Sequence, residues 1–230
     1  MGTLYVVGTP IGNLEDITLR ALRVLREVGL IAAEDTRTTR KLMTHFDIHT
    51  PLVSYHDFSG PGRTRRLIER LADTDVALVS DAGMPGLSDP GYPLIRAAID
   101  AEIPVTTVPG PSALVSALVL SGLPTHAFQY LGFLPRKAGA RRRALERVAS
   151  GADTLVVYES PHRLVACLAD VESVLGPRPV VAARELTKRF EEIVRGSATE
   201  LRAHFEQTPP RGEFVLVIGG NAAADLDGDA

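Results

Sequence analysis

The stretch that decides the fold runs from Val79 to Pro93 and reads V-S-D-A-G-M-P-G-L-S-D-P-G-Y-P. It follows the apolar run Asp75–Val79, which is typical of a buried strand, and it leads into the amphipathic segment Tyr92–Ala101. Its three glycines and three prolines break any helix or strand and indicate a rigid, shaped loop. In open α/β sheets, a loop at the carboxyl end of a strand is where ligands bind.

Two other loops of this kind follow apolar runs elsewhere in the chain. They are Gly8–Asn13, with the sequence G-T-P-I-G-N, and Pro109–Ala113, with the sequence P-G-P-S-A. One such loop alone is equally well explained as a structural turn. Three of them, each closing a strand, indicate three walls of one ligand pocket.

Short apolar runs and amphipathic segments alternate through the first half of the chain. The expected strands are Leu4–Gly8, Leu30–Ala33, Pro51–Tyr55, Asp75–Val79 and Val105–Val108. This alternation predicts a mostly parallel sheet with helices on both faces. The fold class is therefore α/β.

The pattern changes after residue 122, where we expect a second domain. Its expected strands are Phe128–Leu134, Thr154–Tyr158, Phe190–Gly196 and Glu213–Ile218, with a helix at Pro161–Leu175. Antiparallel pairs are expected here, which makes residues 123–219 a mixed α/β domain beside an α/β domain at residues 1–122. The tail, residues 220–230, is rich in Ala, Asp and Gly and is expected to be disordered.

Composition bounds the cellular context. The 230 residues are 45% hydrophobic and 23% charged, as in an ordinary soluble globular protein, and the net charge of −3 excludes a protein that is basic throughout. The single Cys167 lies at helical spacing from Leu164 and Leu168, which predicts a buried thiol in a reducing compartment. No basic region precedes the first apolar run, and no segment is long enough to span a bilayer. We expect a cytoplasmic protein with no membrane contact.

Several common chemistries lack their sequence signals. A dinucleotide loop requires G-x-G-x-x-G, but Pro10 occupies the second glycine's place, and the Gly-Lys-Ser/Thr of a phosphate loop is absent. His45, His49 and His56 are not aligned on one helix face because Pro51 interrupts the segment, so no metal is expected. A pocket of backbone and small side chains suits a reaction in which a cofactor carries the chemistry.

One segment, Arg136–Arg147, is strongly basic and reads R-K-A-G-A-R-R-R-A-L-E-R. It holds six Lys or Arg residues and a single Glu. A solvated helix face is the ordinary explanation for a charge run. Here three consecutive arginines span too wide an arc for one ladder of ion pairs, and few acids lie nearby in the sequence. The segment therefore favours a polyanion partner whose phosphates are contacted. Four further cations would extend the patch if they share its face: Arg163, Arg184, Lys188 and Arg189.

Five motifs occur in order along nearly the whole chain, from about Thr3 to Ile218. They are V-G-T-P-I-G-N-L-E-D-I-T at Val7–Thr18, A-E-D-T-R at Ala33–Arg37, S-D-A-G-M-P-G-L-S-D-P-G at Ser80–Gly91, V-P-G-P-S-A at Val108–Ala113 and Y-E-S-P-H-R at Tyr158–Arg163. Together they resemble the ribosomal RNA methyltransferases of the tetrapyrrole-methylase superfamily. The resemblance implies an S-adenosylmethionine-dependent enzyme that methylates a cytidine ribose 2′-oxygen in 16S rRNA, at the decoding centre of the small ribosomal subunit. It also implies two α/β domains with the cofactor in the cleft between them, and a homodimer.

The resemblance carries site residues with it. The cofactor-binding residues that it implies are Pro10, Asp81, Ala82, Gly83, Met84, Pro85, Ser112, Ala113 and Tyr158. The residues expected to contact RNA are Arg136, Lys137, Arg141, Arg142, Arg143 and Arg163. Candidates to assist the hydroxyl nucleophile are Glu159, His162 and Lys188, together with Glu185. The sequence does not rank these four, and a purely structural pair between Glu185 and Lys188 is the competing interpretation.

Two kinds of alternative stay open. A precorrin C-methylase or a diphthine synthase would share the cofactor loops, but its substrate gives less reason for the basic segment Arg136–Arg147. Outside the enzymes, an RNA-binding assembly factor with a vestigial pocket would keep the basic segment without catalysis.

Overall fold

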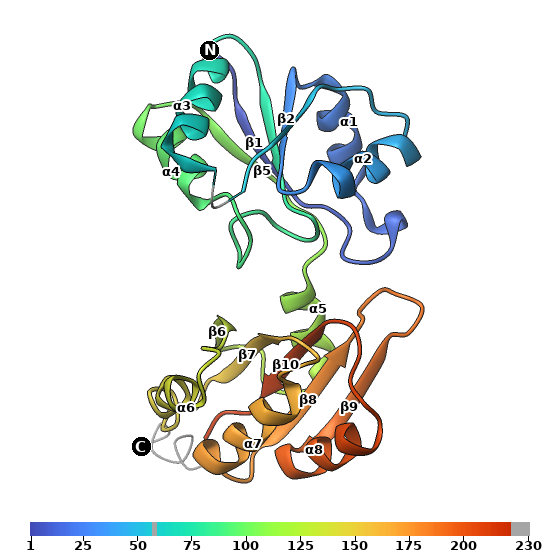
Figure 1. The fold of residues 1–230 in the computed structure, drawn as a ribbon, viewed down its shortest axis with the longest axis vertical. Helices are drawn as coiled ribbons and strands as arrows, with labels where there is room; N and C mark the ends of the chain where they lie inside the picture. The colour runs from blue at the N-terminus through green and yellow to red at the C-terminus, as the bar shows by residue number, and fades with distance from the viewer. Residues whose placement is uncertain (57–58, 222–230) are drawn as a thin grey trace. The chain divides into compact units, whose positions relative to one another are not determined.

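The computed structural model describes residues 1–56 and 59–221. Residues 222–230, most of the tail that is expected to be disordered, lie outside this range. The chain forms two compact units, which meet in sequence between Ser112 and Ala113 (Figure 1). Each unit has its own five-stranded sheet.

The first unit contains a sheet in the order β3-β2-β4-β1-β5, and every pair of neighbouring strands is parallel. Its strands are β1 (Leu4–Val7), β2 (Leu30–Ala33), β3 (Leu52–Ser54), β4 (Val76–Val79) and β5 (Val105–Val108). Its helices are η1 (Leu14–Asp16), α1 (Leu19–Glu27), α2 (Thr36–His45), α3 (Gly60–Leu71) and α4 (Tyr92–Asp100). The expected parallel α/β sheet is confirmed.

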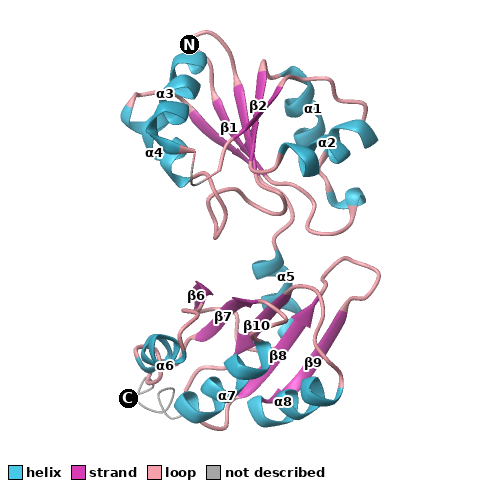
Figure 2. Cartoon of the chain, viewed as in Figure 1, coloured by secondary structure: helices cyan, strands magenta, loops and turns pink. Residues whose placement is uncertain are grey.

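Helices cover both faces of this sheet (Figure 2). Alternate strand residues enter two separate cores, because successive side chains of a strand point to opposite faces. Ala77 and Val79 of β4 pack with α1 and α2, whereas Val76 and Leu78 pack with α3 and α4. The strand is apolar throughout because both of its faces are buried.

The second unit contains a mixed sheet in the order β6-β7-β10-β8-β9. Its strands are β6 (Phe128–Phe133), β7 (Thr154–Glu159), β8 (Pro179–Arg184), β9 (Glu192–Ser197) and β10 (Phe214–Ile218). The β6–β7 pair is parallel and the other three pairs are antiparallel, as the sequence predicts for a mixed domain. Its helices are α5 (Ala113–Ser121), α6 (Ala138–Glu146), α7 (Leu164–Leu175) and α8 (Ala198–Gln207).

Helix α5 accounts for the position of the division between the units. It packs on strands of the second sheet, above all on β10. Helices α6, α7 and α8 share one core with Leu155 and Val157 of β7 and with Leu216 of β10, and α5 contributes nothing to that core. Helix α5 therefore covers part of the opposite face. Its contacts assign it to the second unit, whereas the sequence indicates a boundary after residue 122.

Candidate functional site

Three glycine- and proline-containing loops follow neighbouring strands of the first sheet. They come after β4, β1 and β5, which are adjacent and parallel, so the loops leave the same edge of the sheet. This edge is the carboxyl edge, where open α/β sheets bind ligands. The arrangement brings Pro10 and the expected cofactor residues Asp81–Pro85 to one edge of one unit.

Hydrogen bonds join the first two of these loops. The Thr9 N–H donates to the Gly83 carbonyl at 2.9 Å, and the Gly83 N–H donates to the Thr9 carbonyl at 3.0 Å. The buried Thr9 hydroxyl also donates to the Ser80 carbonyl at 3.2 Å. Gly83 has a φ of 74°, a backbone conformation that strongly favours glycine. The loops are therefore held together by the backbone itself.

The first and third loops approach so closely that neither can carry a side chain at the contact. A Cβ atom on Gly8 would lie 2.7 Å from the Met84 sulfur and 2.8 Å from the Gly110 nitrogen. A Cβ atom on Gly110 would in turn lie 3.0 Å from the Gly8 backbone. All three loops thus meet at Gly8, and this contact makes their arrangement rigid.

Carboxylates that follow β2 and β4 form an acidic border at the same edge of the sheet: Glu34, Asp35 and Asp81. The Asp35 N–H donates to the Asp81 carboxylate at 3.1 Å, and the Asp81 N–H donates to the Glu34 carboxylate at 3.2 Å. Arg37 pairs with Asp35 at 2.7 Å, and hydrogen bonds from Arg37 lower the pKa of Asp35 to about 2. Burial and, to a smaller extent, the nearby Asp35 charge raise the pKa of Asp81, and they outweigh the hydrogen bond from the Asp35 N–H, which lowers it. A carboxylate in this position favours a cationic ligand group, which would restore its charged form.

Sequence reasoning singled out Asp81 but missed Glu34 and Asp35 as members of this border. The signal was present, because the polar residues of A-E-D-T-R directly follow a buried strand that ends at Ala33, just as the central loop follows a strand. What was missing is the adjacency of β2 and β4 in the sheet. The other expected cofactor residues are distributed over the chain: Ser112 and Ala113 lead into α5, and Tyr158 lies in the second unit near the end of β7.

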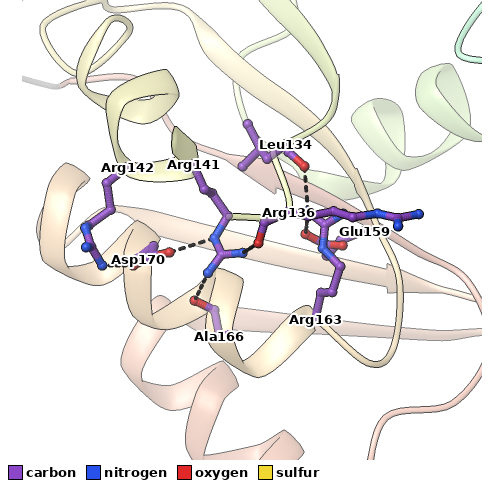
Figure 3. A network of polar contacts seen from close by, with 8 residues as sticks. All are labelled: Leu134, Arg136, Arg141, Arg142, Glu159, Arg163, Ala166 and Asp170. Atoms are coloured by element: carbon purple, nitrogen blue, oxygen red, sulfur yellow. Dashed lines mark hydrogen bonds and ion pairs between the residues drawn. The ribbon is translucent and has the colours of Figure 1, made fainter. Parts of the chain in front are cut away.

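The basic segment contains one arginine that is anchored inside the second unit (Figure 3). The Arg141 Nε atom lies 2.6 Å from Asp170 of α7, and the two side chains are only 6% and 10% exposed. Arg142 reaches the other oxygen of the same carboxylate at 3.1 Å. The expectation that too few acids lie near these arginines to pair with them is therefore wrong for Arg141 and Arg142. Because its guanidinium is buried, Arg141 is also not positioned to meet a phosphate.

The remaining cations of this segment face outward. Arg136, Lys137, Arg142, Arg143 and Arg147 are exposed, and Arg142 keeps 47% of its side-chain surface despite its contact with Asp170. Helical geometry explains why Arg141 differs from Arg142 and Arg143, because consecutive residues are rotated by about 100° around the axis and only one of three neighbours can face the core. These five residues present positive charge on the surface of the second unit.

Glu159, at the end of β7, pairs with Arg163, whose side chain is 22% exposed. Glu159 is buried, accepts the Ser160 N–H at 2.7 Å and lies 3.1 Å from the Arg163 guanidinium. Arg163 also donates to the Leu134 carbonyl at 2.6 Å, which joins α7 to the end of β6. These contacts speak against catalysis by Glu159 and against RNA binding by Arg163. His162, between them in sequence, is exposed.

Lys188 lies between two carboxylates. Its Nζ atom is 2.9 Å from Glu185 and 2.7 Å from Glu213. Partial burial opposes its charge, but the hydrogen bonds to Glu213 and Glu185 prevail and raise the pKa of Lys188. A lysine held in its charged form has no lone pair with which to accept a proton. The geometry therefore supports the structural interpretation of this pair and speaks against Lys188 as a base.

Cys167 is buried in the core of the second unit, as the sequence predicts. Burial and the neighbouring Glu159 raise the pKa of its thiol to about 12. The residue is therefore not an active nucleophile.

Two further properties concern the whole described chain. Across residues 1–56 and 59–221, no group of three His, Cys, Asp or Glu side chains is arranged to hold a metal ion. In the same ranges, every helix is too short or too polar to cross a bilayer.

Known proteins resemble this chain both in sequence and in fold. Residues 3–202 match the family of Tetrapyrrole (Corrin/Porphyrin) Methylases. The chain is 52% identical to a protein of Micromonospora olivasterospora named Ribosomal RNA small subunit methyltransferase I, over 99% of this chain and 74% of that one. Its structure resembles a uroporphyrin-III-C-methyltransferase from Thermus thermophilus, with a TM-score of 0.65, 25% identity and coverage of 100% and 98% of the two chains. It also shares its fold with a diphthine synthase, with a TM-score of 0.72, 14% identity and coverage of 96% and 90%.

Proposed function

Because the chain belongs to the tetrapyrrole methylase family, whose methyl donor is S-adenosylmethionine, we propose that it methylates ribosomal RNA of the small subunit. More specifically, we propose that it modifies the 2′-oxygen of a cytidine ribose in 16S rRNA at the decoding centre. The observation that carries this proposal is the 52% identity, over nearly the whole chain, to a protein named as a small subunit rRNA methyltransferase. The exposed cations of the second unit agree with an RNA substrate.

The loops of the first unit have the chemistry that the methyl donor requires. When bound, S-adenosylmethionine supplies a methyl group on a positively charged sulfur, and it carries an ammonium group as well. Asp81 and Asp35 supply negative charge at the carboxyl edge of the sheet. The tight contact at Gly8 and Gly110 and the hydrogen bonds between Thr9 and Gly83 keep the surrounding backbone rigid. We propose that these loops, with Pro10 and Asp81–Pro85, form the cofactor site.

For the transfer step we propose that alignment contributes most and proton removal less. A positioned nucleophile gains rate because its orientation is fixed before the reaction begins. The hydroxyl must nonetheless lose its proton, and a side chain that can reach an RNA ribose must be exposed. Of the three expected catalytic side chains, Glu159 is buried and Lys188 is held between carboxylates, whereas His162 is exposed. We therefore propose His162 as the proton acceptor.

The direct test uses small ribosomal subunits that lack the modification. The protein is incubated with them and with methyl-labelled S-adenosylmethionine, and the label is mapped by nuclease digestion of the rRNA. We expect label on the 2′-oxygen of one cytidine. Label on a base or on a ribosomal protein, or none at all, would refute the proposal.

Matched variants separate the two parts of the site. Asp81→Asn is expected to weaken cofactor binding in calorimetry, whereas Asp100→Asn, an exposed carboxylate paired with Arg96 on α4, should leave it unchanged. His162→Ala is expected to lower kcat while cofactor affinity stays the same. Normal kcat in the His162 variant would remove it from the mechanism.

We also propose a cytoplasmic homodimer. Sedimentation analysis tests this association, and a species of 24.7 kDa at all concentrations would contradict it.

A further inference from the structure

Four aromatic side chains line one edge of the second sheet. Tyr158 of β7 makes edge-to-face contacts with Tyr130 and Phe133 of β6, with ring centroids 5.2 and 5.7 Å apart. Phe128 begins the same strand, and β6 is the outermost strand of its sheet. We call these residues, Phe128, Tyr130, Phe133 and Tyr158, the aromatic row.

A β-bulge keeps the row on a single face. Phe128 pairs with Thr154 and Tyr130 with Val156, but the register then shifts, so that Phe133 pairs with Tyr158. In a regular strand Tyr130 and Phe133 would point to opposite faces, because the side-chain period is two. The additional residue returns Phe133 to the face of Tyr130. Bulges occur where a side chain must be re-aimed, often beside a functional site.

The row does not belong to the hydrophobic core. Leu155 and Val157 of β7 point toward α6–α8 and are buried there, so Tyr158 and its partners point to the other face. Phe133 is 54% exposed and Phe128 is 42% exposed. The exposed parts of the Phe128 and Phe133 rings add no burial to the core, and adjacent exposed aromatic side chains of this kind indicate a binding role.

Positive charge follows the row in the sequence. Arg136 and Lys137 are exposed and come three and four residues after Phe133. Aromatic faces next to exposed cations are the composition that binds single-stranded nucleic acid, since bases stack on the rings and phosphates meet the cations. A second copy of this chain is a poorer occupant, because it would bring the same cations together.

We propose that the aromatic row is a stacking surface for unpaired bases of RNA, with Phe133 as its principal contact. The inference rests on the proposed function and adds to it a site that selects single-stranded RNA. Phosphate contacts along the basic segment supply affinity without requiring any base.

The test compares two RNA probes of equal charge. One is a short fluorescent single-stranded oligoribonucleotide, and the other is the same strand with abasic positions, which keeps the phosphates and removes the stacking partners. Phe133→Ala in the full chain is expected to weaken binding of the first probe by roughly fivefold to a hundredfold, and to leave the abasic probe unaffected. Phe133→Leu, which keeps an apolar side chain of similar size, should show the same loss. The control is Ile99→Ala, which removes a 53% exposed apolar side chain on α4 of the other unit and is expected to change neither affinity.

Loss of the cations is expected to affect probe binding differently from loss of the Phe133 ring. Replacing Arg136 and Lys137 by Ala should weaken binding of both probes and flatten the salt dependence of the affinity. Unchanged binding of the base-containing strand by the Phe133 variants would overturn the inference. So would an equal loss on both probes, or a wild-type protein that does not prefer the strand with bases.

The same variants distinguish RNA from the other groups that could cover the aromatic row, and they separate failure of this inference from failure of the proposed function. Loss of S-adenosylmethionine affinity in the Phe133 variants would identify the row as a cofactor wall, and a change in sedimentation would identify it as a subunit contact; each result overturns the inference. Methyl transfer to rRNA by the wild-type protein is measured in parallel. If that activity is present while the Phe133 variants bind both probes normally, the stacking surface alone is refuted. If the wild-type protein transfers no methyl group to rRNA, the proposed function is refuted.

Discussion

The buried pair of Arg141 and Asp170 allows a quantitative test of how the basic segment is held. Asp170→Asn keeps the shape of the side chain but removes its charge, which leaves a guanidinium that is 6% exposed without a counter-charge. Removing one partner of a buried ion pair destabilises a protein by about 3–5 kcal/mol. Arg141 also approaches two backbone carbonyls at 3.4 Å, and an asparagine still offers one acceptor oxygen. We therefore expect the lower end of the range, about 3 kcal/mol.

Two companion variants make the reasoning specific. Arg142 contacts the same carboxylate but is 47% exposed, so Arg142→Ala should reduce stability by less than about 1 kcal/mol. A double variant with Arg141→Met and Asp170→Leu removes both charges. Apolar side chains that replace a whole buried pair are often tolerated, so most of the lost stability should return.

Hydrogen exchange measures the effect locally, which matters in a chain with two units. Peptides covering α6 and α7 should exchange about a hundredfold faster in Asp170→Asn, as about 3 kcal/mol requires. Peptides covering β1 and β4 in the other unit are the internal reference and should not change. Exchange in α6 and α7 within about fivefold of the wild-type rate would refute the argument. A double variant less stable than Asp170→Asn would refute it as well.

Three further predictions concern the loops, the acid pair and the thiol. Gly8→Ala places a Cβ atom 2.7 Å from the Met84 sulfur, so the affinity for S-adenosylmethionine, measured by calorimetry, should fall. Gly139→Ala is the control and should match the wild type, because the nearest atom to its Cβ would be an Arg143 guanidinium nitrogen at 3.7 Å, an ordinary contact distance. Hydrogen bonds from Lys188 and the Glu213 N–H outweigh partial burial and lower the pKa of Glu185 below 4.5, so its stabilisation is present above that pH and is lost as the pH falls. The thermal midpoint of Glu185→Gln should therefore be lower than that of the wild type at neutral pH, and the two midpoints should converge in acid. Cys167, whose pKa burial and Glu159 raise to about 12, should resist iodoacetamide at neutral pH until the protein is unfolded, and rapid native labelling would contradict this.

Strand and helix positions could be predicted because their signals are local. The run Leu30–Ala33 is a strand with the same bounds in the structure, and Thr18, a residue type that commonly caps helices, accepts the Ala21 N–H at the start of α1. Apolar runs, capping residues and glycine- or proline-rich turns act within a few residues of the position they determine. The parallel arrangement of the first sheet follows from the order of these elements.

Long-range pairing could not be predicted from the same signals. Asp170 is 29 residues from Arg141, and only the packing of α6 against α7 brings the two side chains together. Counting acids near the arginines therefore led to the wrong expectation about their partners. Likewise, Glu34 and Asp35 meet Asp81 because β2 is next to β4 in the sheet, an order that the periodicity of the chain does not encode.

The two faces of the second sheet show why the basic segment and the aromatic row belong to one argument. The face toward α6–α8 carries the hydrophobic core, and there Asp170 holds Arg141 while Arg163 joins α7 to the end of β6. Arg163 donates to the Leu134 carbonyl and Arg141 donates to the Arg136 carbonyl, so these contacts anchor the segment between β6 and α6, which carries the exposed Arg136 and Lys137. Buried charge is an expensive way to gain stability, because apolar side chains of similar volume commonly do as well. Its presence here is better explained by orientation: the same few residues that are hidden from solvent set the geometry of the surface that we propose to meet RNA.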